Sequence, residues 1–275
     1  MCGHLARNGF EISYLPVSGE GLVDPGDVEA AIRPSTILIS IMHANNEVGT
    51  VQLLTDISHI AREHGIALHT DAAQSVGKIS TDVQALGTDL LSVAGQKVYG
   101  PKGIGALYVR SSLALEKFCI GAGQEKGRRA GTENVMGIVG LGKACAIALK
   151  DLDSNMARMQ YLRDRLHGGL LSRLTGIQLN GHQERRLPNT VSLSFKGLEA
   201  NRILEEIGLE VAASAGAACH ADTVELSHVL VAMGIPVEWA KGTLRFSVGK
   251  MTTEAEIDKA IRVVADAVEK LRGLC

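Results

Sequence analysis

Two short apolar runs that end in polar residues constrain the fold of this chain more than any other feature. The run at residues 66–70 ends at Asp71, and the run at residues 89–94 leads into Gln96 and Lys97. Short, mostly apolar runs of this kind are typical of buried parallel strands. Ligands of open α/β sheets lie at the carboxyl ends of the strands. We therefore expect Asp71 and Lys97 to lie at the same edge of a sheet, facing a ring-sized gap.

This pair of side chains favours pyridoxal phosphate (PLP) as a ligand. A lysine amine forms a Schiff base with the aldehyde of PLP, and a carboxylate keeps the pyridine nitrogen protonated, so that the ring accepts electrons. The residues alone leave simpler interpretations open. Lys97 precedes the turn-rich residues 99–103 and is equally compatible with a solvated lysine, and Asp71 is also suited to cap a helix.

Strand-like and helix-like segments alternate as far as Arg110, which predicts a doubly wound α/β layer. An amphipathic helix is expected at residues 55–64, with Thr55 or Asp56 as its N-cap. The expected strands cover residues 37–42, 66–70, 89–94 and 105–110.

The rest of the sequence predicts a second, smaller α+β domain. We expect a large domain at residues 1–148 and a small C-terminal domain at residues 149–275. Two helices, at residues 134–148 and 151–174, precede the elements of the small domain. The expected strands are 177–179, 190–195 and 243–247, and the expected helices are 198–207, 223–233 and 253–271. Thr253 and Glu256 form a capping box at the start of the last helix.

Composition excludes several classes of protein. The 275 residues are 45% hydrophobic and 21% charged, which is typical of a globular chain. The net charge is −2 with no basic block, so nucleic acid binding is not indicated. The apolar stretch 135–149 contains Lys143 and is too short to cross a membrane. Five dispersed cysteines without a CxxC pair, and nine histidines without metal-ligand spacing, argue against disulfides and a metal site and favour a reducing compartment.

Six motifs occur in a fixed order along almost the whole chain. They are HANNE at 43–47, DAAQ at 71–74, QKVYGPKG at 96–103, RAGTEN at 129–134, SAGAACH at 214–220 and LRFS at 244–247. Together they resemble the NifS-like cysteine desulfurases and selenocysteine lyases of the class V aminotransferase family. The resemblance implies a fold-type I PLP-dependent transferase, with a mainly parallel sheet in the large domain. It begins partway through the family pattern, so the family's N-terminal segment, with a phosphate-binding Ala-Thr turn and a ring-stacking His, is absent from this sequence.

The resemblance assigns roles around the PLP ring. Lys97 resembles the Schiff-base lysine, which also moves the Cα proton of the substrate, and Asp71 resembles the partner of the pyridine nitrogen. Gln74 and Asn46 resemble the amides that hydrogen-bond the phenolic oxygen. Loop amides that satisfy backbone groups are the alternative, and the residues alone favour it for Asn46.

The residues expected around the phosphate differ from the family pattern. The family has a hydroxyl residue three positions before the lysine and a His directly before it, whereas this chain has Ala94 and Gln96. Gln96 still donates a hydrogen bond but carries no charge. Thr132 resembles a residue that reaches the phosphate from the other subunit, and it is also suited to cap a helix that starts near Glu133.

Two further residues resemble those that handle the substrate. Cys219 resembles the sulfur acceptor that becomes a persulfide, and His220 beside it favours the thiolate. A cysteine among alanines is otherwise a packed thiol. Arg245 resembles the arginine that holds the substrate carboxylate, together with Asn46, and bidentate geometry explains why an arginine serves there. An ion pair with Glu238 is the alternative for Arg245.

The resulting hypothesis is a PLP-dependent enzyme that removes sulfur or selenium from L-cysteine or L-selenocysteine and leaves L-alanine. The resemblance implies a homodimer and a sulfur- or selenium-acceptor protein as partner. We predict a cytoplasmic protein, and organellar import stays open because the family's N-terminal segment lies outside this sequence. The alternatives are a catalytically impaired member that serves as dimerisation partner of an intact paralogue, and an aminotransferase of the same family.

Overall fold

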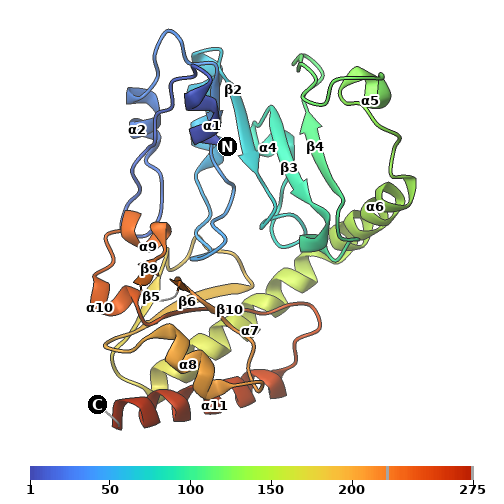
Figure 1. Cartoon of the computed structure of the whole chain (residues 1–275). Coiled ribbons are helices and arrows are strands. Elements are labelled where there is room, and N and C mark those ends of the chain that lie inside the picture. The colour runs from blue at the N-terminus through green and yellow to red at the C-terminus, as the bar shows by residue number, and fades with distance from the viewer. Residues whose placement is uncertain (221–222, 274–275) are drawn as a thin grey trace.

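Two four-stranded sheets organise the chain (Figure 1). The computed structural model describes residues 1–220 and 223–273, with the backbone alone at 217–220 and 223–225. One sheet lies in the N-terminal half and the other in the C-terminal half, and the long helices α6 (Val135–Lys150) and α7 (Leu152–Arg173) lead from the first half to the second. None of the helices in these described ranges combines the length and apolar character that a membrane span requires.

The first sheet has the strand order β1-β2-β3-β4. Its strands are β1 (Leu38–Ser40), β2 (Ala67–Asp71), β3 (Leu90–Ala94) and β4 (Gly105–Val109). The first three are parallel, as predicted, and β4 is antiparallel to β3. A parallel crossover needs a dozen or more residues. Because residues 95–104 are too few for one, the chain turns back and β4 runs antiparallel.

Six helical segments accompany this sheet. They are α1 (Cys2–Arg7), α2 (Pro25–Ala30), α3 (Leu54–Glu63), α4 (Val83–Leu86), the 3-10 turn η1 (Gly95–Val98) and α5 (Gln124–Gly127). The prediction of a Thr55 or Asp56 cap on α3 is wrong. Leu53 occupies the cap position without a side-chain bond, and the Thr55 hydroxyl lies 3.4 Å from the Ala85 carbonyl oxygen instead. Burial of Leu54 and Ile57 against the sheet therefore fixes this helix.

The second sheet is antiparallel, with the order β5-β6-β10-β7. Its strands are β5 (Ile177–Asn180), β6 (Thr190–Phe195), β7 (Ser214–Ala215) and β10 (Thr243–Ser247), and β8 (Ala217–His220) pairs with β9 (Thr223–Leu226) in a separate hairpin. The remaining helices are α8 (Ala200–Ile207), α9 (His228–Ala232), α10 (Val237–Ala240) and α11 (Glu254–Gly273). The predicted strands at 177–179, 190–195 and 243–247 are confirmed.

The predicted helix at residues 223–233 is wrong, because two elements occupy this stretch. The first element along the chain is β9, and its β-branched residues Thr223 and Val224 suit a strand. Ser227 then starts α9, since its side chain accepts a hydrogen bond from the Val229 N–H at 3.1 Å.

Each half has its own hydrophobic core. In the C-terminal half, all six residues of β6 are buried, and α11 buries Ile257, Ile261, Val264 and Val268 along one face. A smaller cluster joins the halves, where Val48 packs with Leu230, Met233 and Ala240. The domain boundary between residues 148 and 149 stays a prediction.

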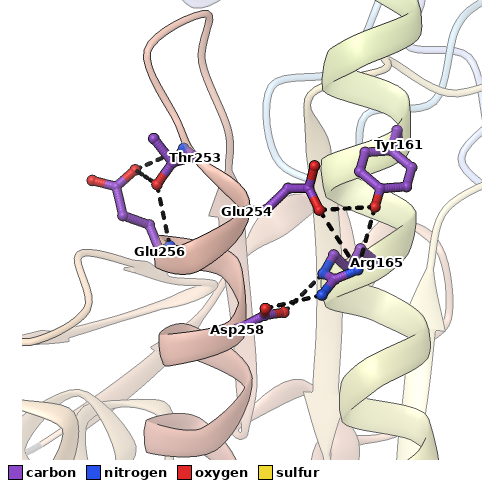
Figure 2. Close-up of polar contacts among 6 residues, drawn as sticks. All are labelled: Tyr161, Arg165, Thr253, Glu254, Glu256 and Asp258. Atoms are coloured by element: carbon purple, nitrogen blue, oxygen red, sulfur yellow. Dashed lines mark hydrogen bonds and ion pairs between the residues drawn. The ribbon is translucent and has the colours of Figure 1, made fainter.

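The start of α11 is fixed by the predicted capping box (Figure 2). The Glu256 carboxylate accepts from the Thr253 N–H at 2.7 Å, and the Thr253 hydroxyl accepts from the Glu256 N–H at 3.3 Å. Arg165 on α7 also holds Asp258 through two bonds of 2.8 and 2.9 Å. Because this ion pair is exposed, it adds little to stability, and the apolar face of α11 supplies most of the packing energy.

The capping box gives a direct test of where α11 starts. Thr253→Ala removes the hydroxyl and should lower the free energy of unfolding by about 1 kcal/mol. Thr253→Ser keeps the hydroxyl and should be close to neutral. Urea denaturation of the three proteins measures the difference, and equal stability of the Ala and Ser variants would refute the cap.

Candidate active site

The carboxyl ends of β2 and β3 bring two of the predicted site residues to one edge of the first sheet. Asp71 is the last residue of β2 and pairs with Ser92 of β3 in parallel register. Lys97 lies in η1, which follows β3 directly. Adjacent strands lie roughly 4.8 Å apart. The predicted delivery of both residues by neighbouring strands is therefore confirmed, while their separation across a ring-sized gap stays a prediction.

A glycine turn sets the position of Lys97. The Gly95 N–H donates to the Ile104 carbonyl at 2.9 Å, and the Gly100 N–H donates to the Gly95 carbonyl at 2.8 Å. A Cβ on Gly95 would lie 2.7 Å from the Ile104 carbonyl oxygen, which is backbone and cannot move aside. This close approach requires glycine, so Lys97 is presented by a tight and rigid turn.

The Asp71 carboxylate is exposed and is not paired with a cation in the described part of the chain. Its Oδ1 accepts from the Ala73 N–H at 2.8 Å, and its carbonyl accepts from the His43 N–H at 2.9 Å. Residues 73–78 form turns, so the interpretation of Asp71 as a helix cap is wrong and it caps a turn. The bond to Ala73 orients the carboxylate and leaves Oδ2 available.

Lys78 is a residue of this region that sequence reasoning missed. Its Nζ donates to the Gln74 carbonyl at 2.9 Å and lies 3.5 Å from the Lys97 carbonyl oxygen. It thereby bridges the turn after β2 and the turn after β3. Burial, with a smaller contribution from the nearby Lys97 charge, lowers the pKa of Lys78 to about 8. The sequence signal was its setting between Val76 and Ile79 with no acidic residue at 72–81.

Arg245 on β10 reaches from the second sheet to the loop that carries Asn46. Its guanidinium donates to the Asn46 carbonyl at 3.0 Å and to the Ser214 hydroxyl at 2.9 Å, and its Nε is buried without a partner among the described residues. The alternative of an ion pair with Glu238 is wrong, because Glu238 pairs with Lys196 at 3.4 Å. Arg245 therefore offers an uncompensated positive charge that suits a carboxylate.

The two asparagines of the HANNE motif have different roles. The Asn45 side chain satisfies the backbone, because its Oδ1 accepts from the N–H groups of Glu47 and Val48 at 2.8 and 3.0 Å. Asn46 is exposed, and its backbone carbonyl contacts Arg245. Asn45 is therefore the loop amide that satisfies backbone groups, and the Asn46 amide stays accessible.

The residues predicted around the phosphate are spread over separate segments. Gln96 and Thr132 are exposed, Ala94 is half-buried, and no hydrogen bond links Thr132 to η1 in the described ranges. The alternative role of Thr132 as a helix cap is wrong, because the Asn134 side chain accepts from the Gly137 N–H at 3.0 Å and caps α6. The backbone of Cys219 lies in β8, and its side chain lies outside the described residues, as does that of His220.

His43 is buried beside this edge and is neutral. Its Nδ1 lies 3.0 Å from the Ser75 hydroxyl, and burial lowers its pKa to about 4. It is a buried histidine near the strand ends whose ring has a hydrogen-bond partner, as is usual for buried polar groups. His43 therefore supports the site by holding the backbone at Asp71.

Comparison with known proteins defines the family. The sequence pattern of the aminotransferase class-V family matches residues 2–260, and the chain belongs to this family. Cysteine desulfurase IscS of Dictyoglomus turgidum is 46% identical over 274 residues, covering 99% of this chain and 70% of the relative. Cysteine desulfurase IscS of Methanosarcina thermophila is 45% identical, covering 99% of this chain and 68% of the relative.

Solved structures agree with this membership. A NifS-like protein superposes with a TM-score of 0.90 at 34% identity, covering 98% of this chain and 71% of that one. A NifS-like protein from Rickettsia africae superposes with a TM-score of 0.88 at 30% identity, covering 98% and 72%. These matches confirm the predicted fold-type I architecture and the resemblance to NifS-like enzymes.

PLP is the cofactor of this family, and the side chains present fit its ring end. The Asp71 carboxylate has an unused oxygen, and the Lys97 amine has no acceptor among the described residues. A free carboxylate and a free amine from neighbouring strand ends are the groups that the ring nitrogen and the aldehyde require. Asp71, Lys97 and the adjacent Gln74 are thus the residues that would hold the ring.

The depressed pKa of His43 predicts acid sensitivity. The unfolded chain takes up a proton on His43 near pH 6.5, whereas the folded chain does so only near pH 4. Folded stability should therefore fall as the pH drops from 6.5 toward 4, by roughly 3 kcal/mol at 1.36 kcal/mol per pKa unit. In His43→Gln this contribution should disappear. Denaturant unfolding at pH 4.5 and 7 measures it, with the exposed His64→Gln as matched control; an unchanged pH dependence in His43→Gln would contradict the assignment.

Proposed function

We propose that this chain removes sulfur from L-cysteine and releases L-alanine, using PLP. The observation that carries the proposal is the pair of unpaired groups, Asp71 and Lys97, at neighbouring strand ends. Arg245, which contacts the Asn46 loop, is a third charged group without an ionic partner among the described residues. Curated relatives at 45–46% identity are cysteine desulfurases, which supports this reaction above others of the family. Bound PLP supplies an electron sink for the bond that breaks at the substrate Cα.

The residues at the sheet edge would hold the cofactor and move one proton. Lys97 takes the Cα proton of the substrate on its amine and returns it during product formation. Asp71 keeps a proton on the ring nitrogen, with its carboxylate oriented by the Ala73 N–H. Gln74 and Asn46 donate to the phenolic oxygen, and the two exposed side chains of Gln96 and Thr132 donate to the phosphate.

Arg245 would select an amino acid substrate by its carboxylate. The Asn46 carbonyl and the Ser214 hydroxyl hold the guanidinium in place, and no carboxylate of the described residues neutralises it. Both groups that bind the guanidinium are neutral. A substrate carboxylate would therefore form a charge-assisted hydrogen bond with Arg245 that these groups do not form. The Asn46 amide, exposed beside it, offers a further donor.

Cys219 would accept the sulfur. Its thiolate would attack the substrate sulfur as the Cβ–S bond breaks. The electron pair of that bond would stay with Cβ, which would take up the proton of the substrate thiol, so that alanine leaves and Cys219 carries a persulfide anion. An acceptor protein then takes the sulfur. Selenocysteine would enter through the same groups and leave its selenium on Cys219 as a selenopersulfide, from which a thiol reductant would release selenide. The cytoplasm is the proposed compartment, in keeping with the free thiols Cys2, Cys119 and Cys145.

The exposed apolar side of α6 supports a homodimer. Val135, Met136 and Val139 are 64%, 87% and 66% exposed, and only Gly137 and Leu141 of this helix are buried. A helix with so much apolar surface is usually covered by a partner. The loop that holds Thr132 directly precedes α6, so a second copy seated there would bring Thr132 close to the interface.

A dimerisation role without catalysis is the second candidate. Ala94 has no donor for the phosphate and Gln96 has no charge, which weakens the grip on PLP, whereas the α6 surface is intact. A colourless chain that pairs with a full-length relative would favour this candidate over the enzyme.

Two substitutions test the catalytic roles. Lys97→Ala should abolish the visible absorbance of bound PLP and lower alanine formation from cysteine by at least about 100-fold. Cys219→Ala should keep the absorbance and lose turnover to a similar extent. Lys102→Ala and Cys145→Ala are matched controls that should behave as the parent. A chain that stays colourless with excess PLP, or full activity in either variant, would refute the proposal.

The α6 surface predicts the oligomeric state. Val139→Glu places a charge in the apolar face and should convert a dimer into monomers, because an unpaired charge is costly in an apolar interface. Arg173→Glu, exposed at the C-terminal end of α7, should leave the dimer intact. Sedimentation velocity measures both, and a parent chain that is monomeric at all concentrations would overturn the homodimer.

A further inference from the structure

Glu47, the last residue of the HANNE motif, joins the two halves of the chain and has no part in the reaction described above. Its carboxylate accepts a hydrogen bond from the Ser227 hydroxyl at 2.5 Å. Both residues are half-buried, and Glu47 forms no ion pair among the described residues. The bond to Ser227 is therefore the polar contact that orients this carboxylate.

Ser227 lies at the base of the hairpin whose strand β8 contains Cys219. β9 ends one residue before Ser227, and β8 begins one residue after Gly216. The Ser227 N–H donates to the Gly216 carbonyl at 3.1 Å and closes the hairpin at its base. The Ser227 hydroxyl also accepts from the Val229 N–H, so it caps α9 while its own proton is donated to Glu47. A single serine thus fixes where the hairpin ends and where the next helix begins.

The base of the hairpin also packs closely against the second sheet. The Gly216 N–H donates to the Thr243 carbonyl of β10 at 2.8 Å. A Cβ on Gly216 would lie 3.0 Å from two side-chain carbons of Thr243 and 3.3 Å from the Cδ1 of Leu230. A side chain at residue 216 would therefore push these neighbours apart. The hairpin thus starts from a fixed point on β10.

The HANNE loop holds the base of the hairpin on both of its sides. Arg245 donates to the Asn46 carbonyl and to the hydroxyl of Ser214, which precedes β8. Glu47 holds the segment that follows β9. The Asn45 side chain accepts from the Glu47 N–H, which fixes the loop itself. Two consecutive residues of one loop therefore connect both ends of the hairpin to the half of the chain that contains the sheet edge at Asp71.

We propose that Glu47 is a positioning residue for sulfur transfer. By holding the base of the β8–β9 hairpin on the loop that presents Asn46, it sets how far the backbone of residue 219 lies from the substrate. Glu47 acts through Ser227 and the hairpin, and not on the reacting atoms. This role rests on the proposed desulfurase function. A displacement of about 1 Å between reacting groups can lower a rate on the order of 100-fold, so a hydrogen bond at the base has a large effect on transfer.

Loss of this bond should affect the step that uses the sulfur acceptor and leave cofactor binding unchanged. The residues proposed to hold the PLP ring, Asp71 and Lys97, lie at the edge of the first sheet and make no described contact with Ser227. In Glu47→Ala we therefore expect the absorbance of bound PLP and the KM for cysteine to stay close to those of the parent. The kcat for alanine formation should fall by about ten- to a hundredfold.

Steady-state alanine formation from cysteine by the full chain with PLP measures this split between kcat and KM. Glu47→Gln keeps an acceptor oxygen for the Ser227 hydroxyl and should retain most of the parent's kcat. Ser227→Ala should lower kcat about as much as Glu47→Ala does, and the double variant should lower it no further, because all three lack the same bond. Glu63→Ala, exposed at the end of α3, is the matched control and should behave as the parent.

Hydrogen exchange of the Ser227 amide, followed by NMR, tests the anchor without turnover. It should be several-fold faster in Glu47→Ala than in the parent and in Glu47→Gln. Equal exchange in the parent and Glu47→Ala would overturn the positioning role, whether or not the parent is active. A parent that forms no alanine would overturn the proposed function and this role with it. In an active parent, full kcat in Glu47→Ala, or an equal loss in Glu47→Gln, would overturn the positioning role alone.

Discussion

The parallel pairing of β2 with β3 is the constraint on which the rest of the site depends. It fixes Asp71 opposite Ser92 and thereby sets where the chain can turn toward the ligand. The turn at Gly95 then fixes the position of Lys97. The Gly95 backbone lies so close to Ile104 that no side chain fits at residue 95. A shift of one residue in this register would turn Asp71 to the other face of the sheet. The backbone thus determines where the side chains of Asp71 and Lys97 can lie.

Lys78 makes a second connection at the edge of the sheet where β2 and β3 end. Its ammonium holds the carbonyls that follow β2 and β3, so the two turns keep their relative position even without a ligand. This connection places a partly buried charge next to the amine on which the proposed reaction relies. The same lysine therefore contributes both to the order of the site and to its electrostatic character.

The sequence was informative where periodicity and strand-end chemistry determine structure. Strand 190–195 and the capping box at Thr253 were predicted because buried strands and helix starts depend on local residue patterns. The helix expected at 223–233 was wrong because hairpin pairing with β8 outweighs helical periodicity. Asp71 and Lys97 were predictable from their strand ends. Lys78 was not, because its role depends on carbonyls from two turns that only the folded chain brings together.

Arg245 connects two parts of the molecule that otherwise have separate cores. It belongs to the second sheet, yet its guanidinium holds the backbone of the loop at Asn46. An anion bound to this guanidinium would therefore lie beside the Asn46 loop as well as β10. Replacing Arg245 would remove an anion-binding group and, in the same step, a hydrogen bond that joins the two halves of the protein.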